Sequence, residues 1–392
     1  MPVMAKISRS LVTQPSWWTR LYVMSIKELL QLGRDFVLLF FIVYAFTVDI
    51  YNAGSGVTLQ VNHAALAVRD SDRSAASREL IGRFRPPYFL LNRFVQDPRE
   101  GQQCLDGGDA MLVLDVPPQF QQSLAQGRPT GVQLQVDATN SVLGSLAASY
   151  AARVVGDYAL DAGLARAGLS SNSAKHLPLI VDDHRVLFNP NQEDSWFMSI
   201  SELLTIITVF AILLPAAAMV REKERGTIEQ LLVSPLSPFQ IMFSKVIAMT
   251  VVILASTALS IFVILKPIFH VPMRGSLLLF FAVTALYIFT TAGLGLFAAT
   301  VSRNLAQAGM LTILILAPML FLSGAWTPPE AMPHWLRNGM SVSPLHYYID
   351  ASFGILLKGA GGDLLWQPIT AMLLIGGVIF GYGMWRFRKQ FD

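Results

Sequence analysis

The feature that most constrains this chain is a set of six apolar stretches, each long enough or nearly long enough to cross a lipid bilayer. A helix needs about 20 predominantly apolar residues to span the hydrocarbon core. The stretches cover residues 36–51, 197–220, 239–265, 276–301, 305–326 and 367–385. Because the runs are continuously apolar and not alternating, they predict transmembrane helices and not the strands of a barrel.

The composition of the chain agrees with membrane lipid as its main solvent. Of the 392 residues, 53% are hydrophobic and only 14% are charged. The net charge of +3 is too small for a nucleic-acid binder, so we expect contact with membrane lipid and no nucleic-acid partner. The single cysteine, Cys104, can form no disulfide within the chain and no Cys-x-x-Cys redox motif.

The placement of Lys and Arg beside the apolar stretches predicts the orientation. Basic residues are retained on the cytoplasmic side of a membrane. They are concentrated in residues 1–35, 221–238 and 386–392, which fall on one side if the chain has six spans. We therefore expect a multi-pass protein with both termini in the cytoplasm.

Residues 52–196, between the first two spans, differ in character and have the size of a domain. Short apolar runs around Leu66–Val68 and Met111–Leu114 and an alternating pattern over Gly131–Val136 predict strands, with helices over Ser74–Phe84 and Val142–Ala167 and after Pro118. The predicted fold class is therefore an α-helical polytopic membrane protein with six transmembrane helices and an inserted external α/β domain between helices 1 and 2. Residues 327–366 are expected to form external amphipathic or re-entrant helices.

The segment that follows the second span, REKERGTIEQLLVSPLSPFQIMFSK, is the most informative in the chain. A charged run precedes a break at Gly226 and Thr227, and Pro235 and Pro238 end the helical part that follows. This pattern predicts a short amphipathic helix on the cytoplasmic face, with acidic contacts on one side and an apolar surface on the other. An ordinary basic loop that only fixes the topology would explain the same spacing.

These motifs resemble the ABC-2-type permease family. The resemblance rests on Gly-Thr-Ile-Glu-Gln-Leu-Leu-Val-Ser-Pro over residues 226–235, on Ser323-Gly324 followed by Pro-Pro-Glu-Ala-Met-Pro over residues 328–333, and on Ser343-Pro344-Leu345. It covers nearly the whole chain. The large domain between the first two spans resembles a subgroup associated with drug export.

The resemblance implies a set of sites and partners. The loop after the second span, residues 221–238, corresponds to a coupling helix that seats in a separate ATP-binding cassette subunit. Its expected contact residues are Glu222, Lys223, Glu224, Arg225, Gly226, Thr227, Glu229, Leu231 and Leu232. Residues 1–35 correspond to an amphipathic connecting helix marked by Trp17, Trp18, Arg20, Lys27 and Glu28.

The resemblance further implies a bacterial cytoplasmic (inner) membrane exporter of amphiphilic, drug-like or lipid-like molecules. A second permease copy or a paralogue would complete a dimer, and a periplasmic membrane-fusion adaptor is a further candidate partner. The sequence has no Gly-x4-Gly-Lys-Ser/Thr phosphate loop. We therefore expect no enzyme activity and no cofactor in this chain, with ATP and Mg²⁺ used by the partner subunit.

Candidate pathway or gate residues lie in or beside the spans. They are Glu202, Pro215, Pro318, Ser323 and Gly324. Small residues, including Gly377 and Gly381 in the last span and Gly295 in the fourth, predict close helix packing, either within the chain or at the seam of a dimer. Two other functions remain open at this point. An ion-coupled transporter would need carboxylates such as Asp49 and Glu202 within the membrane, and a membrane-anchored sensor would use the external domain for its ligand.

Overall fold

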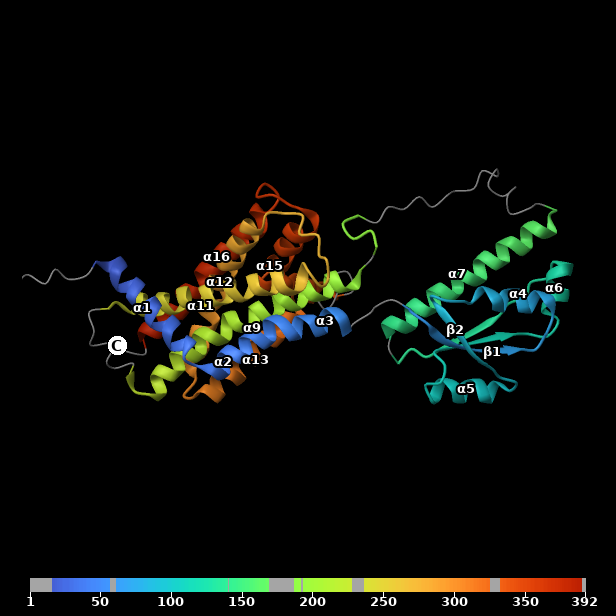
Figure 1. The fold of residues 1–392 in the computed structure, drawn as a ribbon, viewed down its shortest axis with the longest axis horizontal. Coiled ribbons are helices and arrows are strands. Elements are labelled where there is room, and N and C mark those ends of the chain that lie inside the picture. The colour runs from blue at the N-terminus through green and yellow to red at the C-terminus, as the bar shows by residue number, and fades with distance from the viewer. Residues whose placement is uncertain are drawn as a thin grey trace, which may run out of the picture. The chain divides into compact units, whose positions relative to one another are not determined.

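The computed structural model describes residues 16–56, 61–139, 141–168, 187–191, 193–227, 236–324 and 332–389. The chain divides into two compact units (Figure 1). One unit contains Met1–Val57 together with Val186–Asp392, and the other contains Thr58–Arg185. The first unit is helical, and the second contains the sheet.

The helical unit contains the apolar stretches and the helices beside them. It begins with α1 (Trp17–Gly33), which is followed by α2 (Phe36–Tyr44), the π-helical turn η1 (Ala45–Asp49) and α3 (Ile50–Gly56). After the sheet unit come α9 (Asp194–Glu224), α11 (Pro238–Ser260) with η2 (Ile261–Leu265), α12 (Leu277–Val301) and α13 (Leu305–Phe321). The unit ends with α14 (His334–Met340), α15 (Pro344–Phe353), η4 (Gly354–Lys358) and α16 (Trp366–Lys389).

Five of the expected spans are helices long and apolar enough to cross a membrane. They are Phe36–Gly56, Asp194–Glu224, Pro238–Leu265, Leu277–Val301 and Trp366–Arg386. The remaining expected span, 305–326, corresponds to the apolar helix α13 of 17 residues. Residues 325–331 after it lie outside the described part of the chain. The chain is thus a multi-pass membrane protein, and the count of six stays a prediction.

Helix α9 is the central element of the helical unit. It is in contact with α3, α11, α12, α13 and α15, and most of its apolar length is buried. Gly295 of α12 brings the two backbones together, because a methyl group there would overlap the carbonyl oxygen of Ile212. The close packing expected at Gly295 is confirmed.

The glycines that bring α16 close to α12 are not the predicted ones. A Cβ atom on Gly377 or Gly381 would meet no atom within 4 Å in this chain. Instead, Gly376 lies against Thr290, and Gly383 lies against the backbone of Gly293. The prediction of packing within the chain was wrong for Gly377 and Gly381, because a spacing of four identifies one face of a helix without saying what that face contacts. The alternative, that these glycines lie at the seam of a dimer, stays a prediction.

Helix α15 lies in the buried core of the helical unit although it comes from the polar stretch 327–366. Tyr348 stacks on Tyr287 of α12 with ring centroids 4.0 Å apart, and both rings are fully buried. Their hydroxyl groups are paired, because Tyr287 donates to Thr208 at 2.9 Å and Tyr348 shares a hydrogen bond with Thr284 at 3.0 Å. This contact joins α9, α12 and α15 through satisfied polar groups.

The second unit is a mixed sheet with helices on both faces (Figure 1). Its elements are β1 (Ala64–Asp70), α4 (Ala75–Arg83), β2 (Phe89–Phe94), α5 (Pro98–Asp106), β3 (Leu112–Val116), α6 (Phe120–Gln126), β4 (Gln133–Val136) and α7 (Ser141–Arg166). The strand order is β2-β1-β3-β4. Strand β1 is parallel to β2 and β3, and β4 is antiparallel to β3.

The two faces of the sheet follow the alternation of its strands. Leu66 and Val68 pack with α4, α6 and α7 on one face, whereas Ala67 packs with the buried Cys104 of α5 on the other. The other strands and helices of this unit were predicted from the sequence, but β2 and α5 were not. Strand β2 is mostly exposed, and α5 is mostly polar and buries only Gly101 and Cys104.

A substitution tests the contact between α9 and α12. We expect Gly295→Ala to lower the thermal stability of the purified protein, because its methyl group would force two buried backbones apart. The control is Gly309→Ala in α13, where the new methyl group would meet no atom within 4 Å. That control should leave the melting temperature unchanged or slightly raised, since Ala favours a helix over Gly. Equal melting temperatures for both variants would contradict the packing.

Candidate functional site

The last turn of α9 carries four consecutive charged residues, Arg221 to Glu224. The span was expected to end at residue 220, but α9 continues unbroken to Glu224. A helix turns about 100° per residue, so four successive side chains point in four directions. Each of these four side chains therefore reaches a different part of the surrounding bundle.

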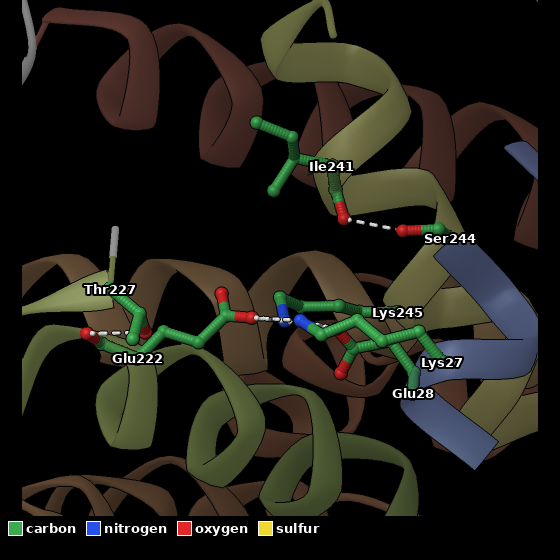
Figure 2. A network of polar contacts seen from close by, with 7 residues as sticks. All are labelled: Lys27, Glu28, Glu222, Thr227, Ile241, Ser244 and Lys245. Atoms are coloured by element: carbon green, nitrogen blue, oxygen red, sulfur yellow. Dashed lines mark hydrogen bonds and ion pairs between the residues drawn. The ribbon is translucent and has the colours of Figure 1, made fainter. Parts of the chain in front are cut away.

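Glu222 enters a buried cluster with Lys27 and Glu28 of α1 and Lys245 of α11 (Figure 2). Lys245 Nζ lies 2.8 Å from Glu222 Oε1 and 2.9 Å from Glu28 Oε1. Lys27 Nζ lies 3.0 Å and 3.2 Å from the same two oxygens. The two ammonium groups and two carboxylates thus alternate around a ring whose net charge is zero, and we call it the four-charge cluster.

The burial of the four-charge cluster makes its pairing necessary. The side chains of Lys245, Glu28 and Glu222 are 0%, 3% and 4% exposed, and only Lys27 reaches solvent, at 43%. An unpaired charge in such a place would cost several kcal/mol (an order-of-magnitude value) in desolvation. The cluster therefore fixes three helices, α1, α9 and α11, at one point.

The buried face of α1 is not purely apolar. It carries Leu21, Ser25, Glu28 and Leu32. Leu30, although apolar, is 59% exposed. Glu28 takes a core position because Lys245 lies opposite, an arrangement that apolar periodicity does not predict.

The other end of α1 is attached to the start of α11. Gln240 donates from Nε2 to the carbonyl oxygen of Trp17 at 3.1 Å, and the Trp17 ring stacks on Phe239. Trp18 is 72% exposed, and Arg20 is half-buried. Helix α1 therefore lies along α11, held by aromatic and amide contacts at one end and by the four-charge cluster at the other.

Arg221 connects α9 to the first span. Its Nη1 lies 2.6 Å from Asp35 Oδ2, and Asp35 also caps α2 by accepting a hydrogen bond from the backbone of Leu38. The hydrogen bond from Leu38 and the charge of Arg221 hold the pKa of the Asp35 carboxyl below its usual value. The ionised carboxylate therefore serves both the helix N-terminus and the arginine.

Lys223 and Glu224 connect α9 to the next two apolar helices. Lys223 Nζ donates to the carbonyl oxygens at the end of α12, at 2.8 Å to Ala299 and 3.2 Å to Ser302. Glu224 Oε1 accepts from the backbone N–H of Leu305, the first residue of α13, at 2.9 Å. A cation thus lies at a helix C-terminus and an anion at a helix N-terminus, as the helix dipoles favour.

The expected coupling residues separate into groups in the structure. Glu222 is buried in the four-charge cluster, whereas Glu224 and Arg225 are exposed. Gly226 ends the helical path with a φ of +66°, and Thr227 donates to the backbone carbonyl of Glu222 at 3.3 Å. Glu229, Leu231 and Leu232 lie outside the described residues.

The five expected pathway residues are spread along the helical unit. Glu202, half-buried, and Pro215, buried, both lie on α9, about 20 Å apart along its axis at ~1.5 Å per residue. Pro318 is exposed on α13. Ser323 is buried and donates to the carbonyl oxygen of Leu320 at 2.6 Å, and Gly324 has a φ of +84°. The structure does not gather these residues into one cluster.

The sequence analysis missed the partners that hold the expected residues. A signal for Lys245 was present in the sequence, because a lysine at the start of an apolar helix needs a buried carboxylate nearby. Asp35, just before the first span, matched the N-cap pattern of Asp followed by an apolar helix. Neither signal identifies the partner residue, because the contacts of Asp35 with Arg221 and of Lys245 with Glu28 join residues about 200 positions apart in the chain.

Comparison with known proteins gives one family. A family model described as ABC-2 family transporter protein matches residues 36–385. The chain is 34% identical to the inner membrane transport permease YhhJ of Escherichia coli over 369 residues, which cover 94% of this chain and 97% of YhhJ. It is 28% identical to the probable multidrug ABC transporter permease YbhR of the same organism over 372 residues, 95% of this chain and 99% of YbhR.

Two substitutions test the four-charge cluster. Lys245→Met removes the buried cation between two carboxylates, so we expect it to cost about 3–5 kcal/mol of stability. The double variant Glu222→Gln with Lys245→Met leaves Lys27 paired with Glu28 and should recover most of the loss. Thermal unfolding of the purified proteins and their abundance in the membrane measure both effects. A double variant no more stable than Lys245→Met would contradict the ring of alternating charges.

A pH titration tests Glu28. Burial alone would raise the pKa of Glu28, but Lys245 and Lys27 bind the carboxylate and hold the pKa below its ordinary value. The stability from this group is therefore complete above the unfolded-state pKa of about 4.3 and is lost as pH falls through the lower folded-state pKa. We expect the melting temperature to fall less steeply with acidification in Glu28→Gln than in the parent protein. Equal slopes would show that Glu28 does not titrate as a paired group.

Proposed function

Because this chain belongs to the ABC-2 transporter family, we propose that it is the membrane subunit of an ATP-driven exporter. The family implies a separate ATP-binding subunit as partner. The names of YhhJ and YbhR, both permeases, support transport as the function, and the word multidrug in the name of YbhR supports an amphiphilic small molecule as the substrate. Export is the proposed direction.

The observation that carries the proposed mechanism is the set of contacts made by the last turn of α9. Arg221 binds Asp35 at the start of α2, and Glu222 binds both α1 and α11. Lys223 binds the end of α12, and Glu224 binds the start of α13. A force applied just after Gly226 therefore reaches five helices through one turn of α9. Coupling by this route needs rigid contacts. The buried charge pairs supply them at Glu222, and a partly exposed ion pair and hydrogen bonds to helix ends supply them at the other three residues.

We place the contact with the ATP-binding subunit in the segment that follows α9. In this proposal Thr227, Glu229, Leu231 and Leu232 contact the partner directly, while Glu222 transmits the movement from within the bundle. Helix α1, the connecting helix, moves with α9 because the four-charge cluster joins them. ATP and Mg²⁺ bind the partner subunit and not this chain.

The remaining parts of the proposal concern assembly and topology. Two permease copies, or this chain with a paralogue, would present two coupling segments to two ATP-binding subunits. The end of α9 that carries Arg221 to Glu224 would face the cytoplasm, and residues 58–185 would face the periplasm, where an adaptor protein could receive the substrate. Glu202, Pro215, Pro318, Ser323 and Gly324 remain candidates for the pathway.

The double variant Lys223→Ala with Glu224→Ala tests this mechanism. It removes the contacts of α9 with α12 and α13 but leaves the four-charge cluster in place. We expect the ATP-binding subunit to bind and hydrolyse ATP as before, while efflux of ethidium, a cationic amphiphilic dye, falls about tenfold or more. Transport should fall because the movement no longer reaches α12 and α13.

The matched control is Arg303→Ala, which removes an exposed charge from the short connection between the same two helices. It should leave ethidium efflux unchanged. If the double variant is present at normal abundance and exports ethidium at the parental rate, the end of α9 does not couple the two activities. If the parent protein neither exports ethidium nor co-purifies with an ATPase, the exporter proposal itself is wrong.

A further inference from the structure

A basic pocket lies where α1 meets the first span. Its volume is about 680 Å³, and its lining comes from α1, the start of α2 and the end of α9. Four of the lining residues are basic, namely Lys27, Arg34, Arg221 and Arg225, and Asp35 is the acidic one. The pocket therefore has a surplus of positive charge.

Two of the four basic residues in the pocket are available to an anion. Lys27 is paired with Glu28 and Glu222, and Arg221 is paired with Asp35. Arg34 and Arg225 are exposed, and in the described part of the chain neither forms an ion pair with a carboxylate, although the charge of Arg225 helps to lower the pKa of the Asp35 carboxyl. The two guanidinium groups come from different segments, one just before the first span and one just after α9.

The same pocket has an apolar side. Phe36 and Val37, which begin the first span, are 84% and 78% exposed, and Leu30 of α1 is 59% exposed. Large apolar side chains at the first turn of a membrane span face the boundary between headgroups and hydrocarbon. The pocket thus joins two arginines to a surface that suits acyl chains.

We propose that this pocket binds the phosphate headgroup of an anionic phospholipid, with the acyl chains lying along Phe36, Val37 and Leu30. Guanidinium groups bind phosphate oxygens through paired hydrogen bonds, and basic pockets between membrane helices select anionic lipid headgroups. A free phosphate would gain nothing from the apolar side. The inference does not depend on the export function.

A bound lipid would also contact the coupling machinery. Lys27 and Arg221 line the pocket and hold α9 against α1 and α2. A phosphate between Arg34 and Arg225 would join the residue that follows α1 to the residue that follows α9. Occupancy of the pocket therefore stabilises the same end of the bundle that the four-charge cluster fixes.

Native mass spectrometry of the full-length protein in detergent tests the proposal. The protein is mixed with phosphatidylglycerol or with phosphatidylcholine of identical acyl chains, and the lipid adducts are counted. The pocket variant carries both Arg34→Gln and Arg225→Gln. The control variant carries both Arg303→Gln and Arg386→Gln, which remove two exposed charges outside the pocket. Thermal unfolding of each variant shows whether it is folded.

The parent protein should retain phosphatidylglycerol about tenfold more than phosphatidylcholine. The pocket variant should lose this preference, and the control variant should keep it. Equal retention of the two lipids by the parent protein would overturn the proposal without any substitution, as would a folded pocket variant that keeps the preference. Displacement of phosphatidylglycerol by millimolar inorganic phosphate would also overturn it, because the site would then bind a free anion.

Discussion

Two lysines and two glutamates in a ring are the interaction on which the helical unit depends. Each Nζ atom of Lys27 and Lys245 lies between the same two carboxylate oxygens, at 2.8–3.2 Å. Burying three of these four charges costs more than one pair returns, so the arrangement is stable only because each charge has two opposite neighbours. The cluster therefore fixes the positions of three helices relative to one another. Helices α1, α9 and α11 can separate at this point only if a buried charge loses its partner.

The same constraint explains why the end of α9 can serve as a mechanical link. A membrane span held only by apolar contacts can slide or rotate at small cost, because lipid and leucine are nearly equivalent neighbours. Four successive charged side chains fix α9 in rotation and in depth. Arg221 and Asp35 join it to the cap of α2, and Lys223 and Glu224 join it to the facing ends of α12 and α13. In the proposed mechanism, a movement of the segment after Gly226 is shared by the helices around it.

The sequence predicted the class of the molecule more fully than its internal contacts. Long apolar runs identify membrane helices because their length matches the bilayer, and short apolar or alternating runs identified three of the four strands of the sheet unit. Strand β2 was missed because its apolar residues are mostly exposed and do not alternate, and helix α5 was missed because it is mostly polar and buries only Gly101 and Cys104. The segment after the second span was identified from its charged residues, but the contacts that these residues make were not predicted. Glu222 was expected as an exposed contact and is buried, because its partner Lys245 lies on another helix and no local pattern reveals a pairing over that distance.

In the proposed mechanism, the segment after α9 receives the movement of an ATP-binding subunit. Site-specific photo-crosslinking tests this contact most directly. A photoreactive amino acid at Thr227, which follows the turn at Gly226 after the end of α9, is compared with one at Ser341, an exposed residue in the turn between α14 and α15. We expect position 227 to crosslink to an ATP-binding subunit in native membranes, with a yield that changes when ATP is trapped, and position 341 to give no such product. Absence of the crosslink at 227, or an equal yield at both positions, would contradict the account.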